Sequence, residues 1–239
     1  MRVRSFGHRL RLRGWQLTHR GTDRQCPACG LQIGEFAPYG VARRRDAQCP
    51  RCGSLERHRA LALYVTEHPE LDASNGRVLA IAPDSHLEKR GRRNPDYLSI
   101  DLAPGRAMQT MDLERLDLPD EDRDLVIAYH VLEHIRNDAR AMLEIARVLR
   151  PAGTAILEVP LRGDETDERF ADAPAEVRAR EYDQADHVRM YGRADFEGRL
   201  RRAGLSATAV HVGEAFRTEV EHAALNPDEI FHVARRTLA

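Results

Sequence analysis

Short apolar runs alternate with amphipathic stretches through the middle of the chain. Runs rich in Val, Ile and Leu cover Arg77–Ile81, Tyr97–Ile100, Asp124–Tyr129 and Thr154–Val159, and each is too short for a helix. From Asp138 onward, between the last two runs, apolar residues recur at the spacing of an amphipathic helix. A strand, a helix and a second apolar strand in succession are typical of a parallel βαβ unit. We therefore expect an α/β fold with a doubly wound, mostly parallel sheet.

The remaining patterns extend this arrangement toward both ends of the chain. A polar helix is expected over Asp84–Arg92 and another over Asp195–Gly204, and two strands are expected near Ser206–Val212 and Glu229–Ala234. A helix is also expected between Ser54, a suitable N-cap, and Pro69. On that helix, the simplest interpretation of Arg57, His58 and Arg59 is a polar face that is solvated or lies beside a metal site.

Polar side chains follow two of the expected strands. His130 comes directly after one apolar run, and Asp101 comes directly after another. Ligands of such sheets bind outside the carboxyl ends of the strands, so these two residues are candidates for ligand contact. The adjacent Glu133 and His134 have a second interpretation, in which they only cap or orient the turn.

The sequence His130-Val131-Leu132-Glu133-His134 also has the His-x-x-Glu-His spacing of one class of zinc metalloproteases. In those enzymes both histidines lie on one face of a helix. Here a strand-like run ends immediately before the motif, so the motif falls on a turn. We therefore do not expect this pair of histidines to form a protease-type metal site.

Two Cys-x-x-Cys pairs give a more specific signal. Cys26 and Cys29 are separated from Cys49 and Cys52 by nineteen residues, a spacing typical of zinc ribbons. Four thiolates satisfy a tetrahedral zinc ion and leave no open position, which favours a structural site over a catalytic one. Disulfides would require an oxidising compartment, which nothing in the sequence indicates. Each pair is followed by a glycine suited to a left-handed turn, at Gly30 and Gly53.

Composition and charge narrow the class of protein. Of the 239 residues 42% are hydrophobic and 31% charged, and the formal net charge is −1, so the whole chain has no general attraction for nucleic acid. No apolar stretch approaches the length of a membrane span or resembles a signal peptide, and we expect a cytoplasmic protein. Residues 1–24 are rich in arginine and nearly free of acids. They form either a basic arm that contacts phosphate or a membrane surface, or a poorly ordered tail, and we favour the tail.

The segment LPDEDRDLVIAYHVLEHIRNDARAMLEIARVLRPAGTAILEVP resembles the central region of class I S-adenosylmethionine-dependent methyltransferases, in the subgroup with the HVLEHI signature. RVLAIAPDSHL resembles the first cofactor loop of that subgroup, YLSIDLAP its second acidic strand, and DHVRMYGRADF with LRRAGL its substrate-side segment. The resemblance implies a Rossmann-like methyltransferase sheet of seven strands over residues 54–239, preceded by a small zinc ribbon over residues 25–53.

The resemblance also assigns a cofactor site for S-adenosylmethionine. Asp101 would hold the ribose hydroxyls, and its distance of about twenty residues from the first strand suits that role. An exposed acid at the end of a strand is the alternative for Asp101, and a solvated loop acid is the alternative for Asp112. The residues expected around the cofactor are Ala82, Pro83, Asp101, Leu102, Asp112, Leu113 and Tyr129.

The first cofactor loop departs from the general pattern of the resembled enzymes. Their Gly-x-Gly-x-Gly loop is absent, and Ala82 and Pro83 stand in its place. Ala82 is small, but Pro83 has no N–H to offer a carboxylate. Either the cofactor binds weakly, or Asp84 and Ser85 supply contacts in a different way.

Residues 161–191 are expected to form a lid over a substrate cleft. Within this lid, His187 is a candidate general base or substrate clamp, and Arg189 or Tyr191 would bind a polar substrate. The alternative for His187 is a structural hydrogen-bonding group, and the alternative for Arg189 is a surface partner for nearby acids. Together with His130, His187 completes the candidate catalytic pair.

The sequence therefore predicts an S-adenosylmethionine-dependent methyltransferase with structural zinc at Cys26, Cys29, Cys49 and Cys52. The resemblance implies a small-molecule or saccharide acceptor. One alternative is a catalytically degenerate binding protein of the same fold, indicated by the missing glycines. The other is an RNA methyltransferase that uses the ribbon for its substrate, which is less favoured because aromatic residues are sparse near the cysteines. The acceptor atom and the oligomeric state are not predicted.

Overall fold

The computed structural model describes residues 6–40 and 43–237, which divide into two compact units. The sheet unit comprises residues 73–210 and 230–239, and the cysteine unit comprises residues 1–72 and 211–229. The segment 54–72, expected with the methyltransferase domain, therefore groups with the cysteine unit, as does the late segment 211–229. No helix in the described part of the chain is long and apolar enough to cross a membrane.

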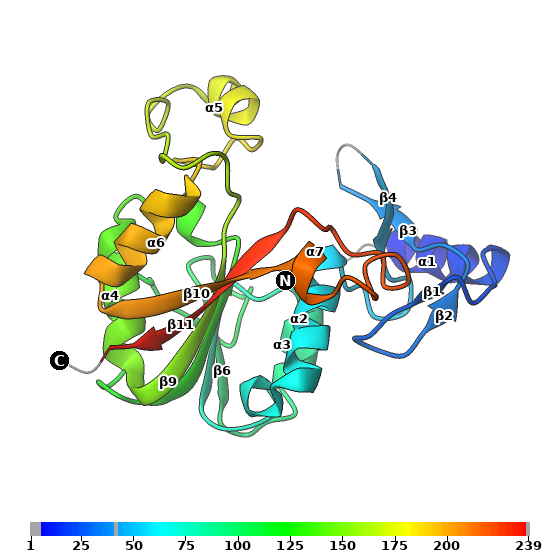
Figure 1. Ribbon diagram of the computed structural model, residues 1–239, viewed down its shortest axis with the longest axis horizontal. Coiled ribbons are helices and arrows are strands. Elements are labelled where there is room, and N and C mark those ends of the chain that lie inside the picture. The colour runs from blue at the N-terminus through cyan, green and yellow to red at the C-terminus, as the bar shows by residue number, and fades with distance from the viewer. Residues whose placement is uncertain (1–5, 41–42, 238–239) are drawn as a thin grey trace. The chain divides into compact units, whose positions relative to one another are not determined.

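A seven-stranded sheet forms the centre of the sheet unit (Figure 1). Its strand order is β10-β11-β9-β8-β5-β6-β7, in which β5, β6, β7, β8 and β9 run parallel and β11 runs antiparallel to β9. This confirms the expected doubly wound, mostly parallel sheet. The strands are β5 (Val78–Ile81), β6 (Tyr97–Asp101), β7 (Gln109–Thr110), β8 (Arg123–Tyr129), β9 (Leu149–Glu158), β10 (Leu205–His211) and β11 (Ile230–Arg236).

Helices pack on both faces of this sheet. Figure 1 shows α4 and α6 on one face and α3 on the other. The sheet-unit helices are α3 (Ser85–Gly91), η2 (Leu132–His134), α4 (Asp138–Val148), α5 (Ala175–Glu181) and α6 (Arg193–Arg202). The central strands are apolar because both of their faces are covered: all four residues of β5 are buried, as are Leu125 to Ala128 of β8.

Local signals explain where the helices begin. The Asp84 carboxylate accepts hydrogen bonds from the backbone N–H groups of His86 and Leu87, which caps α3. The side chain of Asn137 accepts a bond from the N–H of Arg140 and caps α4 in the same way. The strand after α4 begins at Leu149 rather than at the expected Thr154, because Leu149 already pairs with Arg123 before an irregularity in the ladder.

The cysteine unit is built from short elements. It contains α1 (Phe6–Thr18), β1 (Arg24–Gln25), β2 (Gln32–Ile33), β3 (Ala37–Tyr39), β4 (Arg44–Gln48), α2 (Glu56–Glu67), η1 (Pro69–Leu71) and α7 (Val212–Ala215). Two antiparallel pairs, β1 with β2 and β3 with β4, carry the cysteine pairs at their ends. The small apolar core around them includes Leu31, Ile33 and Phe36.

Arg59 on α2 holds the cysteine unit together from within. Its side chain is fully buried, and its guanidinium donates to five backbone carbonyl oxygens, including those of Ala223 and Ala224 at 2.6 Å each. Its guanidinium carbon also lies 4.4 Å from the centre of the Phe36 ring. The expectation of a solvated polar face is therefore wrong for Arg59, and also for His58, whose Nδ1 accepts the N–H of Leu55 at the start of α2.

The arginine-rich N-terminal segment contains a helix where a poorly ordered tail was expected. Leu12 on α1 is buried, and the indole N–H of Trp15 donates to the carbonyl oxygen of Glu35 at 2.9 Å. These two contacts attach the helix to the strands that carry the cysteines. The part of the expectation that concerns residues 1–5 lies outside the described residues.

Candidate active site and cysteine cluster

The carboxyl ends of the parallel strands bring most of the candidate residues to one edge of the sheet. Ala82 follows β5, Asp101 ends β6, Tyr129 ends β8 with His130 next to it, and Glu158 ends β9. The strand order reverses direction between β5 and β8, since β6 lies on one side of β5 and the later strands on the other. Crevices for ligands form at such a reversal.

The loop after β5 bends sharply at Ala82. Ala82 has a φ of 45°, in the left-handed region, and its N–H donates to the carbonyl oxygen of Ile100 at 2.7 Å. Glycine is the residue that adopts this conformation without strain. The backbone therefore takes a glycine-like turn although the sequence has no glycine there. Because Asp84 accepts from the first N–H groups of α3, the loop presents a carboxylate at the start of that helix.

The remaining candidate cofactor residues differ in exposure. Asp101 is partly exposed, and its Oδ1 accepts the N–H of Ala103 at 2.8 Å, which fixes the carboxylate at the end of β6. Leu102 is 71% exposed, whereas Leu113 is buried in the main apolar core. Asp112 is exposed and accepts the N–H of Glu114 at 2.9 Å. The Leu113 side chain is thus enclosed by the core and is not available to a ligand.

His130 stands between two buried carboxylates. Its Nδ1 lies 3.1 Å from Oε1 of Glu133, and its Nε2 lies 3.4 Å from Oε1 of Glu158. The His130 φ of 52° turns the chain out of β8, and its N–H donates to the carbonyl oxygen of Glu158. A non-glycine residue in this conformation is uncommon and is often found at functional sites. A histidine with carboxylate neighbours is equipped to accept or pass on a proton.

His187 reaches the same place from the segment after α5. It is buried, and its Nε2 lies 3.9 Å from Oε1 of Glu133. Burial lowers the pKa of His187, so its imidazole is held in the neutral form. Its ring makes an edge contact with that of His134, with centroids 4.7 Å apart. The structure therefore gathers both predicted catalytic histidines around one carboxylate.

The side chains of Arg189 and Tyr191 bond to the segment 132–138, which carries Glu133 and His134. The buried Arg189 guanidinium donates to the carbonyl oxygens of Leu132, Ile135 and Arg136, the turn that carries Glu133 and His134. The hydroxyl of Tyr191 donates to the Asp138 carboxylate at 2.6 Å. Both side chains are buried and committed to internal contacts, which does not suit the predicted binding of a polar substrate. Arg189 does pair with an acid, Glu168, as its alternative expected, but it is buried rather than at the surface.

Sequence reasoning missed Glu158. This residue is 5% exposed and directly follows the buried apolar residues Ala155, Ile156 and Leu157 at the end of β9. A carboxylate inside an apolar run was the available signal, since buried acids are rare without a partner or a function. Glu133, for which structural and functional interpretations were both open, is fully buried and faces three histidines.

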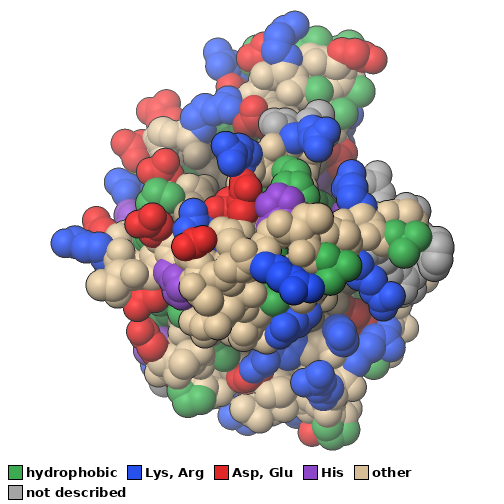
Figure 2. All heavy atoms as spheres, turned by 90° about the vertical axis from the view of Figure 1, so that its right-hand side faces the viewer, with side chains coloured by type: hydrophobic (Ala, Val, Ile, Leu, Met, Phe, Trp, Pro, Cys, Tyr) green, Lys and Arg blue, Asp and Glu red, His purple; other side chains and the backbone are tan. Residues whose placement is uncertain are grey.

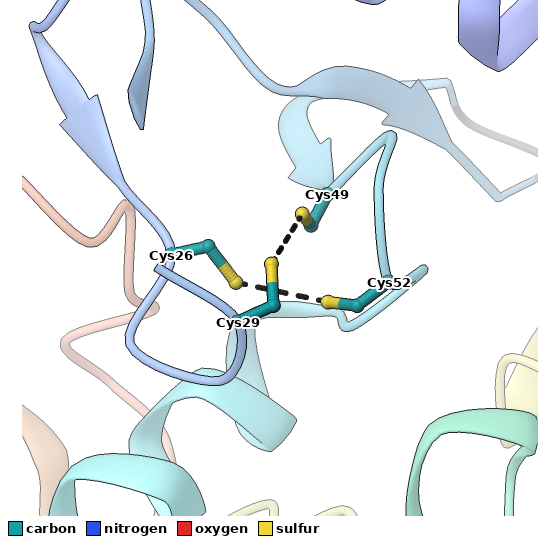
Figure 3. A group of neighbouring side chains, drawn as sticks. All are labelled: Cys26, Cys29, Cys49 and Cys52. Carbon is teal, nitrogen blue, oxygen red and sulfur yellow. Dashed lines mark hydrogen bonds between the residues drawn. The ribbon is translucent and has the colours of Figure 1, made fainter. Parts of the chain in front are cut away.

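The four cysteines converge in the cysteine unit (Figure 3). Cys26 Sγ lies 3.8 Å from Cys52 Sγ, and Cys29 Sγ lies 3.7 Å from Cys49 Sγ. None of the four is part of a disulfide. A tetrahedral zinc ion with Zn–S bonds of about 2.3 Å separates its sulfurs by about 3.8 Å. The geometry of the donor set therefore fits a zinc ion.

The surroundings of the sulfurs also suit a metal. Gly30 and Gly53 have φ values of 71° and 80°, which confirms the two expected left-handed turns after the cysteine pairs. The Ser54 hydroxyl oxygen lies 3.3 Å from Cys26 Sγ and 3.1 Å from Cys52 Sγ.

Comparison with known proteins identifies the family. A family model described as a methyltransferase domain matches residues 55–210, well over half of the chain. The chain belongs to the S-adenosylmethionine-dependent methyltransferase family. A protein of Mycolicibacterium smegmatis named a probable S-adenosylmethionine-dependent methyltransferase is 32% identical over 134 residues, which cover 53% of this chain and 49% of that protein. The chain thus spans about half the length, or less, of the curated relatives that it matches.

Solved structures show the same methyltransferase fold. An S-adenosylmethionine-dependent methyltransferase from Archaeoglobus fulgidus aligns with a TM-score of 0.53 and 10% identity, covering 77% of this chain and 95% of that one. The [4+2]-cyclase SpnF aligns with a TM-score of 0.54 and 17% identity, covering 86% and 87% of the two chains. At these identities the similarity is one of fold alone. The chemistry of this methyltransferase-family chain must be argued from its own residues.

Proposed function

We propose that the chain transfers a methyl group from S-adenosylmethionine to a hydroxyl or amine of a small-molecule or saccharide acceptor. The observation that supports this most strongly is the position of His130, which lies at the carboxyl end of β8 with a carboxylate beside each ring nitrogen. The cofactor supplies a methyl group already activated by its positive sulfonium. The protein then needs to align the acceptor and remove its proton.

Different residues at this edge of the sheet would bind different parts of the cofactor. Asp101, held by the N–H of Ala103, would accept hydrogen bonds from ribose hydroxyls, and the turn at Ala82 would let the backbone approach the cofactor. Pro83, Leu102, Asp112, Leu113 and Tyr129 would line the remainder of the cofactor crevice. The Asp84 carboxylate, which caps α3, is suited to an ammonium group at the methionine end rather than to its carboxylate.

His130 is the proposed base because its imidazole is partly exposed, whereas His187 is 1% exposed. Glu133 and Glu158 would stabilise the imidazolium that forms when His130 accepts a proton. His187 remains the second candidate for this role. The segment 161–191, which returns to its start through the bridge between Leu161 and Tyr191, is the proposed lid over the acceptor.

The four cysteines are proposed to hold a structural zinc ion in a ribbon. Four sulfur ligands would leave no position open for substrate, so the zinc would stabilise the cysteine unit and take no part in methyl transfer. We also propose that the chain belongs to the HVLEHI subgroup and that the protein is cytoplasmic.

A binding protein without transferase activity is the second candidate. It is favoured by Ala82 and Pro83, where a strained alanine and a residue without an N–H replace the glycines of the resembled loop. A cyclase on this fold shows that the fold also serves other chemistry.

An RNA substrate has weaker support. Figure 2 shows arginine and lysine side chains spread over one face of the molecule among acidic ones. In the cysteine unit, however, Arg44 pairs with Glu56 and Arg45 pairs with Glu35, so part of its positive charge is already neutralised.

A labelling experiment tests the proposal. The zinc-loaded chain is incubated with methyl-labelled S-adenosylmethionine and fractionated small-molecule extracts, with parallel incubations on RNA. We expect label in a small-molecule fraction, and inhibition by S-adenosylhomocysteine. Tight cofactor binding without label in any fraction would contradict the enzyme and favour the binding protein, and label in RNA would contradict the acceptor class.

A further inference from the structure

Three possible metal ligands lie close together in the sheet unit, next to His130. A carboxylate oxygen of Glu133, a ring nitrogen of His134 and a ring nitrogen of His187 all lie within 4.8 Å of one another. Glu133 and His134 come from η2, and His187 comes from the segment after α5. The N–H of Val188 donates to the carbonyl oxygen of Glu133 at 2.9 Å and so ties these two segments together.

His134 is already oriented as a ligand. Its Nδ1 lies 3.3 Å from the backbone oxygen of Asp186 and 3.6 Å from the Asp186 carboxylate, which fixes the proton on Nδ1. The other ring nitrogen, Nε2, faces Oε1 of Glu133, 4.0 Å away. Metal-binding histidines usually donate their other N–H to a carbonyl or a carboxylate in this way.

The other two ligands are buried with unused polar atoms. Glu133 is 0% exposed and its Oε2 has no hydrogen-bond partner. His187 is 1% exposed and neither ring nitrogen makes a hydrogen bond of regular geometry, although the backbone of Tyr182 lies close enough to interact with the ring. His187 Nε2 points toward Glu133, with 3.9 Å between Nε2 and Oε1. Buried polar atoms are nearly always satisfied by protein, water or an ion. Their presence at a single point indicates that something binds there.

The charges favour a cation as the occupant. Two buried carboxylates, those of Glu133 and Glu158, lie beside the imidazoles of His130, His134 and His187. The Arg189 guanidinium, which contacts the same turn, is engaged by backbone carbonyls and by Glu168. A metal with bonds of about 2.1 Å needs its ligands roughly 3 to 3.5 Å apart, so the ligand atoms would have to move inward by less than about 1 Å.

We infer that Glu133, His134 and His187 form a binding site for a divalent transition-metal ion. Two imidazoles and one carboxylate are the donor set of Zn²⁺, Mn²⁺, Co²⁺ and Fe²⁺ sites that keep open positions. The site differs from the metalloprotease pattern excluded above, because His187 from the lid segment takes the place of His130. His130 is then left to handle the proton.

A metal at this position would bind an oxygen of the acceptor and lower the pKa of its hydroxyl next to His130. This use of the metal rests on the proposed methyl transfer, whereas metal binding itself does not. The acceptors best suited to an ion with open positions carry two adjacent oxygens, as in a catechol, a hydroxy acid or a sugar diol.

Metal titration of the zinc-loaded full chain tests the site. Elemental analysis first establishes one zinc per chain at the cysteines. Co²⁺ is then added and followed by visible absorption, and Mn²⁺ is added and followed by electron paramagnetic resonance. We expect one further ion per chain, with weak cobalt bands in the visible and no near-ultraviolet thiolate band. A thiolate band would report exchange at the cysteines instead.

Variants locate the ion. Glu133→Gln and His187→Asn preserve side-chain shape, and His134→Ala removes a partly exposed ligand; each should weaken Mn²⁺ binding by at least about tenfold. Asp186→Asn should weaken it less. His68→Asn is the matched control, since His68 also has a carboxylate neighbour, Glu70 at 3.7 Å, but is exposed in the cysteine unit. Circular dichroism verifies that each variant is folded.

The possible results distinguish failure of the metal site from failure of the proposed methyl transfer. No second ion, or a second ion whose affinity is unchanged in all three ligand variants, overturns the metal site. Cofactor binding by S-adenosylmethionine calorimetry is independent of either result, so its failure counts against methyl transfer and leaves the metal site standing.

Discussion

The Nδ1 atom of His130 lies 3.1 Å from the Oε1 atom of Glu133, three residues further along the chain. Because His130 has a φ of 52°, the chain leaves β8 in a tight turn that places its imidazole beside that carboxylate. The strained backbone and the ion pair are thus two aspects of one local structure. We therefore predict that the His130 side chain can be replaced while the turn after β8 is kept.

The variant His130→Asn tests this prediction. Asparagine tolerates the left-handed region better than most residues, so the turn should survive. If His130 is the base, kcat should fall by roughly 10²- to 10⁴-fold, the usual contribution of general-base catalysis. The affinity for S-adenosylmethionine, measured by calorimetry, should stay within about twofold. Loss of cofactor binding together with activity would show that His130 acts through the fold rather than on the acceptor.

The variant Ala82→Gly tests the substitute cofactor loop. An alanine at a φ of 45° is strained by about 1 kcal/mol, which glycine relieves. The gain is partly offset by the greater freedom of glycine in the unfolded chain, so the free energy of unfolding should change little or rise slightly. Without its Cβ the loop should approach the cofactor more closely and bind it more tightly.

The matched control for this prediction is Ala152→Gly. Ala152 is also exposed with a φ of 65°, but it lies near the start of β9, at the opposite end of the sheet from the candidate site. Its replacement should have the same effect on unfolding and none on cofactor affinity. Equal effects of both substitutions on affinity would mean that the loop at Ala82 does not contact the cofactor.

The variant Arg59→Lys tests the interior of the cysteine unit. A lysine cannot reproduce the planar set of donors that reaches five carbonyl oxygens, so buried acceptors would be left unsatisfied. Burial lowers the pKa of Arg59, and a lysine placed there would give up its proton more readily. We expect a loss of about 3 kcal/mol in denaturant unfolding. Arg51→Lys, at an exposed position, should change stability by less than about 0.5 kcal/mol.

Removal of zinc should disrupt the cysteine unit selectively. Trp15 is the single tryptophan of the chain and packs against the apolar cluster that contains Cys26 and Cys49. A strong chelator, or Cys49→Ser, should therefore shift the tryptophan emission to longer wavelength as those loops open. Cofactor affinity should persist, since the residues assigned to it all lie in the sheet unit. An unchanged emission spectrum after verified zinc removal would contradict a structural role for the ion.

The sheet unit was largely predictable because its elements carry local signals. The strands β5, β6 and β8 begin and end within about a residue of the apolar runs that predicted them, since strands covered on both faces must be apolar along their whole length. α4 begins at Asp138 as expected, with its cap at Asn137. The reversal in strand order then follows from the right-handed crossover connections of parallel strands. That reversal places His130 and Asp101 at the same edge of the sheet.

What the sequence could not supply depends on contacts between distant segments. Arg59 is buried where its guanidinium donates to the carbonyl oxygens of Ala223 and Ala224, which lie more than 160 residues further along the chain. The arrangement of His187 beside Glu133 likewise depends on the path of the lid segment rather than on spacing. An arginine looks the same in sequence whether it is solvated or buried, so no local pattern predicts its place.

Calorimetry on the full, zinc-loaded chain tests the central claim most directly. S-adenosylmethionine and S-adenosylhomocysteine should both bind with one site per chain, and Asp101→Ala should weaken both by at least about tenfold because the ribose hydroxyls lose their acceptor. Asp117→Ala, at an exposed loop position, should bind as the unaltered chain does. Absence of binding by folded protein, or equal affinity of the Asp101→Ala variant, would contradict the assignment of the cofactor to this edge of the sheet.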